Sequence, residues 1–199
     1  MWKRLLYVND IFLHVYKMME RLPFGNEHII KTTNDSRDVH GLLEKTDVHL
    51  EFLTEEIAQA KHELSRMDIG SEGKYVLVLN RGQRYLNDTF PNRDWKYHEW
   101  RNVSINDYNP AMEELVKSGY FVIRVGHLVS DLMNIDNPKI IEYDHDGFRT
   151  DLLDIYLGAN CRFLLTCDSG YQGVPGWVFR RPLLYVSVCL IEHLAHFLP

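Results

Sequence analysis

Arginine side chains gather in the polar stretch 80–104, which directly follows a strongly apolar run. A guanidinium presents a planar pair of N–H donors that matches the oxygens of a phosphate or a carboxylate. The formal net charge of the chain is −6, so an anion has to be held by a local cluster rather than by a basic surface. We therefore expect an anion site here, with Arg81 best placed because it follows the apolar run; the alternative is a solvated loop with salt bridges. The other arginines and the histidine of the stretch are Arg84, Arg93, Arg101 and His98.

A further arginine, Arg124, stands inside the apolar segment 120–126. A buried guanidinium needs a partner. The sequence leaves two possibilities open: the phosphate of a ligand, or an internal carboxylate such as Asp151 or Asp154. Gly126 gives the turn after this segment room for a close approach of the backbone.

The segment 166–170 joins an apolar strand pattern to the expected start of a helix and contains Asp168, Ser169 and Gly170. The first backbone N–H groups of a helix lack partners within the helix, and the helix dipole favours negative charge there. Diphosphate binding by Ser169 and Gly170 is one interpretation of the motif, and a simple helix cap is the other.

Other sequence motifs argue against several classes of site. The pattern Glu192-His193-Leu194-Ala195-His196 lacks the HExxH spacing of a zinc protease, so we expect no metal site. No GxSxG, P-loop or GxGxxG motif occurs. The acidic net charge disfavours nucleic acid as a partner.

Cysteine usage and hydropathy indicate the setting. The three cysteines form no CxxC pair, which fits a reducing, cytoplasmic environment. No run of about 18 apolar residues occurs, so we expect no transmembrane helix. The segment 1–10 has a basic start but lacks a signal-peptide cleavage site, so we do not expect it to be a signal peptide.

Strand and helix patterns alternate from residue 74 onward. This alternation predicts βαβ units and an α/β fold, with a mostly parallel, Rossmann-like sheet covered by helices. Before it, residues 1–22 show the apolar spacing of an amphipathic helix, 23–53 are polar, and a helix begins at Thr54 and ends near Gly70. We therefore predict a helical connector or partner-packing region over 1–70 and a Rossmann-like domain over 71–199. The expected strands are 75–79, 120–126, 140–143, 162–166 and 182–188, and the expected later helices begin at 109 and 150.

The stretch from Tyr75 to Val188 resembles a family of bacterial glycosyltransferases associated with surface-polysaccharide synthesis. Members of this family commonly carry His-x-Arg-Asp at the end of the first strand. Here Arg81 is kept, whereas Leu79 and Gly82 stand in the His and Asp positions. The resemblance rests on blocks in the same order at 80–86, 91–102, 119–126, 137–143, 150–157, 161–170, 174–175 and 179–182.

The family resembles GT-B glycosyltransferases, in which two Rossmann-like halves face each other. This implies that the chain is the C-terminal, donor-binding half, which binds a nucleotide-diphosphate sugar without a metal or other cofactor. The other half would be a separate chain or be replaced by a homo-oligomer. By the resemblance, Arg81, Arg124, Ser169 and Gly170 would hold the diphosphate, and His98 or Asp94 would be the general base. Supporting roles would fall to Arg101, Gly126, Asp151, Asp154 and Asp168.

Two functional hypotheses follow. The first is a glycosyltransferase, or its donor-binding half, that transfers a sugar to a glycan or lipid-linked hydroxyl acceptor in the cytoplasm or at the inner face of a membrane. The second is a noncatalytic Rossmann-like binding or assembly module, a truncated relic of the enzyme. The changes at Leu79 and Gly82 favour the second hypothesis, whereas Arg81, Arg124 and the Ser169-Gly170 loop favour the first.

Overall fold

The chain divides into two compact units, Met1–His40 and Gly41–Pro199. In the first unit, helix α1 (Leu6–Met19) lies within the predicted amphipathic helix and is followed by the short turn η2 (Gly25–His28). The computed structural model describes residues 6–29, 41–70, 73–82, 84–92, 94–96, 102–127, 131–167 and 169–186.

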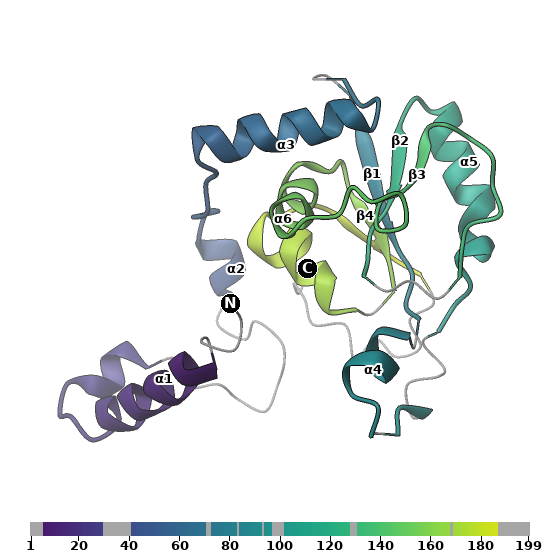
Figure 1. Cartoon of the computed structure of the whole chain (residues 1–199). Helices are drawn as coiled ribbons and strands as arrows, with labels where there is room; N and C mark the ends of the chain where they lie inside the picture. Colours follow the sequence, from purple (N-terminus) through teal and green to yellow (C-terminus); the bar gives the residue numbers. More distant parts are fainter. Residues whose placement is uncertain are drawn as a thin grey trace. The chain divides into compact units, whose positions relative to one another are not determined.

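The second unit contains a five-stranded sheet in the order β3-β2-β1-β4-β5, and every pair of neighbouring strands is parallel (Figure 1). The predicted α/β, Rossmann-like fold is therefore confirmed. The strand β1 lies at the centre, and all five of its residues are buried. The strands are β1 (Tyr75–Leu79), β2 (Phe121–Arg124), β3 (Ile140–Glu142), β4 (Leu164–Thr166) and β5 (Leu183–Tyr185).

Helices cover both faces of the sheet (Figure 1). Because side chains alternate along a strand, Leu77 of β1 packs with α3 and α6 on one face while Val78 packs with α5 on the other. The α6 face also carries the turns that join β4 to β5. The helices and turns of this unit are α2 (Leu42–Lys45), α3 (Thr54–Arg66), α4 (Arg84–Thr89), η4 (Ile105–Tyr108), α5 (Asn109–Lys117), α6 (Asp151–Asn160), η5 (Gly170–Gln172) and η6 (Gly173–Val178).

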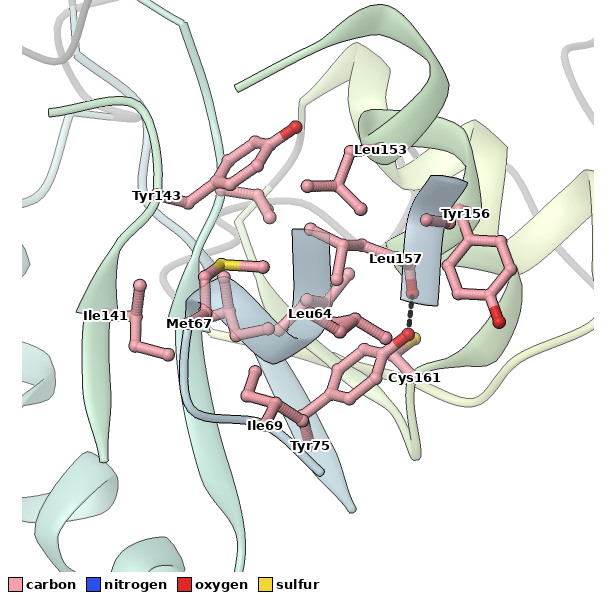
Figure 2. Close-up of a cluster of buried hydrophobic side chains, with 14 of the residues drawn as sticks. Leu64, Met67, Ile69, Tyr75, Ile141, Tyr143, Leu153, Tyr156, Leu157 and Cys161 are labelled. Carbon is pink, nitrogen blue, oxygen red and sulfur yellow. Dashed lines mark hydrogen bonds between the residues drawn. The ribbon is translucent and has the colours of Figure 1, made fainter. Parts of the chain in front are cut away.

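The larger core lies between the sheet and helices α3 and α6 (Figure 2). Leu64 of α3 and Leu157 of α6 meet Tyr75 of β1 there. The hydroxyl of Tyr75 is buried, and it donates a hydrogen bond to the backbone carbonyl oxygen of Leu157 over 3.3 Å. This bond removes the cost of burying the hydroxyl group and joins the start of the central strand to α6.

The buried thiol of Cys161, at the end of α6, makes the protein sensitive to alkali. Burial raises the pKa of Cys161 from its ordinary value of 9.0 to about 11. The folded state keeps this proton to higher pH than the unfolded state, so the contribution of Cys161 to stability is constant below pH 9 and falls as the pH rises toward 11. We expect a loss of about 2 kcal/mol from this group by pH 10.5. Urea unfolding between pH 8 and 10.5 measures this loss. If the unfolding free energy of a Cys161→Ala variant depends on pH as that of the unmodified chain does, the loss does not come from Cys161.

Besides strands that are shorter than expected, the described elements differ from the expected ones in the N-terminal half of the second unit and in the connection after β1. Helix α3 begins at Thr54 but ends at Arg66, before the expected end near Gly70. Its N-cap is Leu53, whose N–H donates to the Glu56 carboxylate over 2.8 Å. The expected loop at 80–104 contains α4. Finally, α3 lies in the compact unit that starts at Gly41, because its residues Ala60 and Leu64 pack in the core of that unit. The predicted domain boundary at residue 71 separates α3 from this core.

Candidate functional site

The carboxyl ends of all five strands lie at one edge of the sheet, because the strands are parallel. The chain connects β1 to β2 on one side and later places β4 on the other side of β1, so the strand order reverses next to β1. In open parallel sheets, ligands bind at the carboxyl edge near such a reversal. The segments after β1 and β4 are therefore the first places to search for a site.

A pocket of about 520 Å³ opens directly after β1. One wall comes from the end of β1 and from α4: Arg81 is half-buried, and Arg84 and Asp88 form an ion pair with an Nε to Oδ2 distance of 3.5 Å. Arg84, Asn87 and Asp88 share a face because positions three and four apart in a helix are neighbours. The lining residues are Arg81, Gly82, Arg84, Asn87, Asp88, Asn102, Val103, Ser104 and Asp131.

The opposite wall is the segment that precedes α5. Asn80, buried at the end of β1, donates from Nδ2 to the carbonyl oxygen of Val103 over 3.0 Å. The Asp131 carboxylate accepts from the backbone N–H of Ile105 at 3.1 Å and from the Ser104 hydroxyl at 3.4 Å. A side chain from the end of β1 and one from the segment between β2 and β3 thus fix a wall that carries no sheet hydrogen bonds of its own.

Arg124 is buried, with 2% of its side chain exposed, and is held by groups of the fold. Its Nη2 donates to Asn80 Oδ1 at 3.1 Å and lies 3.3 Å from Asp131 Oδ1. Its Nη1 donates to the Asp131 carbonyl oxygen at 2.5 Å and lies 3.3 Å from Glu142 Oε1. Of the two kinds of partner left open by the sequence, the structure therefore supplies internal carboxylates, and they are Asp131 and Glu142.

The two aspartates expected as partners of Arg124 pair with Arg149 instead. Asp154 Oδ2 lies 2.7 Å from Arg149 Nη2, and Asp151 Oδ1 lies 3.8 Å from the same atom. Burial raises the pKa of Asp154, against the opposing effect of Arg149. These groups stabilise the start of α6, where the hydroxyl of Thr150 accepts from the N–H of Leu153 at 3.1 Å.

Of the remaining predicted residues, those that the structure describes do not line the pocket described above. Ser169 and Gly170 follow β4 at the carboxyl edge, where the N–H of Ser169 donates to Gln172 Oε1 over 3.3 Å. Gly126 has a φ of +131°, a conformation that favours glycine. Asp94 is exposed and accepts from the N–H of Lys96 at 2.9 Å. The residues Arg93, His98, Arg101 and Asp168 lie outside the part of the chain that the structure describes.

Sequence reasoning missed two features of this edge. The first is the pair of wall-fixing residues Asn80 and Asp131; Asn80 had a signal, because it directly follows the buried strand, whereas Asp131 had none. The second is a pair beyond β2 and β3, in which His127 Nδ1 lies 3.2 Å from Asp144 Oδ1. Both members of that pair follow parallel neighbouring strands, which is how they meet.

A second hollow, of about 440 Å³, lies beside α5 over β4 and β5. It is mainly apolar, with Leu115, Phe163 and Leu184 among its lining residues. Specific small-molecule sites combine apolar walls with converging polar groups. The charged residues that line this second hollow, Asp107 and Glu114, are acidic, so the pocket after β1 is the better candidate for an anion.

Within the described ranges, no three His, Cys, Asp or Glu side chains are grouped so that they could hold a metal ion. The same ranges contain no helix with the length and hydropathy needed to cross a membrane.

The fold and its polar edge define the class of the protein: an α/β protein with a Rossmann-like parallel sheet. Comparisons of the chain with protein-family models, with curated proteins and with solved structures find no significant match.

Proposed function

We propose that the chain binds a nucleoside diphosphate and is the donor-binding half of a glycosyltransferase that uses a nucleotide-diphosphate sugar. The observation that carries the proposal is the pocket of about 520 Å³ at the carboxyl edge, with Arg81 and Arg84 in its lining. Its volume lies within the range of roughly 300–1,000 Å³ that is typical of small-ligand sites.

The lining suits a ligand that is both anionic and rich in hydrogen-bonding groups. Two guanidinium groups can bind phosphate oxygens, and Asn87, Asn102 and Ser104 add amide and hydroxyl groups. Asp88 and Asp131 offset the formal charge of the two arginines. We therefore expect affinity to depend on directional hydrogen bonds more than on net positive charge.

In glycosyl transfer, negative charge accumulates on the departing diphosphate as its bond to the sugar breaks. A hydrogen-bond donor that is already in place, such as the guanidinium of Arg81, stabilises that charge. The acceptor hydroxyl loses its proton to a general base, for which His98 and Asp94 remain the proposed residues. A glycan or lipid-linked acceptor and a facing half, from another chain or a second copy, complete this proposal.

A noncatalytic binding or assembly module is the second candidate. It is favoured by the burial of Arg124 in ion pairs with the fold's own carboxylates, which leaves fewer cations for a diphosphate than the sequence suggested. Nucleotide binding without transfer activity would fit this second function.

Binding of a nucleoside diphosphate is expected to raise the melting temperature of the chain, and Arg81→Ala is expected to remove most of the rise. A ligand at 100 times its Kd adds about 2.7 kcal/mol to stability. Loss of a charged hydrogen bond costs about 1.5–3 kcal/mol of binding free energy. Thermal unfolding with UDP, GDP, ADP and CDP measures both effects, and added salt should reduce the rise.

The matched control is Arg162→Ala. This arginine is exposed and precedes β4, so it lies at the amino edge of the sheet, away from the pocket. The variant should respond to nucleotide as the unmodified chain does. If no nucleotide at millimolar concentration shifts the melting of the folded chain, the donor-binding proposal is wrong.

A further inference from the structure

We propose that Arg124 is a positioning residue of this pocket: it holds the wall at Val103, Ser104 and Ile105 through Asn80 and Asp131, and it does not contact the bound phosphate. This inference deepens the proposed function and rests on it for the identity of the ligand. It replaces the direct phosphate contact that the sequence suggested for Arg124.

The first connection runs through Asn80. Arg124 Nη2 donates to Asn80 Oδ1 at 3.1 Å, and Asn80 Nδ2 donates to the carbonyl oxygen of Val103 at 3.0 Å. An amide side chain has one accepting and one donating end, and here each end has a defined partner. The guanidinium therefore fixes the orientation of Asn80, and Asn80 fixes the backbone of the wall.

The second connection runs through Asp131, which lines the pocket itself. Its Oδ1 lies 3.3 Å from Arg124 Nη2, and its carbonyl oxygen accepts from Nη1. Its Oδ2 accepts from the N–H of Ile105 at 3.1 Å and from the hydroxyl of Ser104 at 3.4 Å. The two oxygens of one carboxylate thus join the buried cation to the wall.

The charge around Arg124 argues against a phosphate there. One guanidinium faces two carboxylates, from Asp131 and Glu142, so the cluster carries a formal charge of −1. The side chain of Arg124 is 2% exposed, and the pocket lining does not include it. A phosphate at Arg124 would have to displace one of these carboxylates from the buried guanidinium, which is unfavourable.

The two roles predict opposite effects of Asp131→Asn on the binding of inorganic pyrophosphate. If Arg124 binds phosphate, removing a competing carboxylate frees the cation and lowers the Kd. If Arg124 positions the wall, the substitution weakens the connection to Ser104 and Ile105, and we expect the Kd to rise about tenfold, the size of one lost hydrogen bond to a charged group.

Glu142→Gln is the matched control. Glu142 also pairs with Arg124 and accepts from the N–H of Met133, but it lies outside the pocket lining. This variant changes the formal charge by the same amount as Asp131→Asn and leaves the wall in place. Calorimetric titration should give a Kd that is unchanged or lower. A Kd that falls or stays constant in Asp131→Asn overturns the proposal.

Amide hydrogen exchange tests the same connection without any ligand. Arg124→Lys keeps the charge, but a single ammonium group lacks the planar fork that reaches both Asn80 and Asp131. We expect exchange in 103–106 to become about tenfold faster, as expected when one hydrogen bond to a charged group is lost. Exchange in α3 should stay constant. If exchange in 103–106 is unchanged in Arg124→Lys, the proposal is wrong. If the unmodified chain does not bind pyrophosphate, the proposed ligand class is contradicted, and the exchange result alone decides the role of Arg124.

Discussion

Replacement of Arg124 by methionine is expected to lower the free energy of unfolding by about 3–5 kcal/mol, the usual cost of breaking a buried ion pair by removing one partner. The substitution leaves the carboxylates of Asp131 and Glu142 close together without their shared cation. It also removes the donor that orients Asn80. Urea unfolding monitored by circular dichroism measures the change.

Two comparisons separate burial from charge in this prediction. Arg66→Met removes an arginine whose ion pair with Glu63 is short, at 2.6 Å, but whose side chain is 52% exposed, so we expect a loss of less than about 1 kcal/mol. Adding Glu142→Gln to Arg124→Met should recover part of the stability, because it removes one uncompensated charge. Equal losses for Arg66→Met and Arg124→Met would show that the Arg124 cluster is not an important source of stability.

The fold was predictable where local sequence and tertiary packing agree. The five apolar residues of β1 form a run too short for a buried helix and are bounded by Lys74 and Asn80, so they favour a strand covered on both faces with the bounds that the structure has. Helix α5 begins at Asn109-Pro110, and Gly119, with a φ of +90°, follows its end, as expected for a helix stop.

Prediction failed where an element depends on its neighbours. Helix α4 has only six residues and lacks an apolar period, so nothing local distinguishes it from a loop. The strands β4 and β5 have three residues each, fewer than their apolar patterns suggested, because pairing with the neighbouring strands sets where they end.

The topology determines which segments meet at the carboxyl edge of the sheet, but it does not determine the partners of the side chains in the candidate site. The parallel topology brings the segments after β1, β2 and β4 to one edge, as expected. The partner of Arg124 depends on the register of two strands, since Arg124 lies opposite Glu142 in the β2–β3 pair. Asp131 comes from a segment without periodicity, so no spacing rule could have found it. The sequence therefore indicated a buried cation that needs a partner, and only the tertiary structure identifies Asp131 and Glu142 as the partners.

Leu77→Ala is expected to destabilise the chain by about 2–5 kcal/mol, the range for truncating a buried leucine. Leu77 lies in the middle of the central strand with none of its surface exposed, and it packs in the core with side chains of α3 and α6. Closely packed surroundings cannot fill the space left by the side chain, so the lost contacts and the cavity both contribute. Equilibrium unfolding in urea measures this change. The urea concentration at the midpoint should fall, while the slope of the unfolding free energy against urea concentration stays the same.

Leu184→Ala is the control for that prediction, because it makes the same chemical change on the outer strand β5, where the leucine is 53% exposed. Folding removes little apolar surface from contact with water at this position, so truncation should cost less than about 1 kcal/mol. A large difference between the two variants is expected because β1 is the central strand, covered on both faces, whereas Leu184 lies half-exposed on the outer strand β5. Similar losses for Leu77→Ala and Leu184→Ala would contradict this difference in burial, and with it the central place of β1, after which the pocket opens.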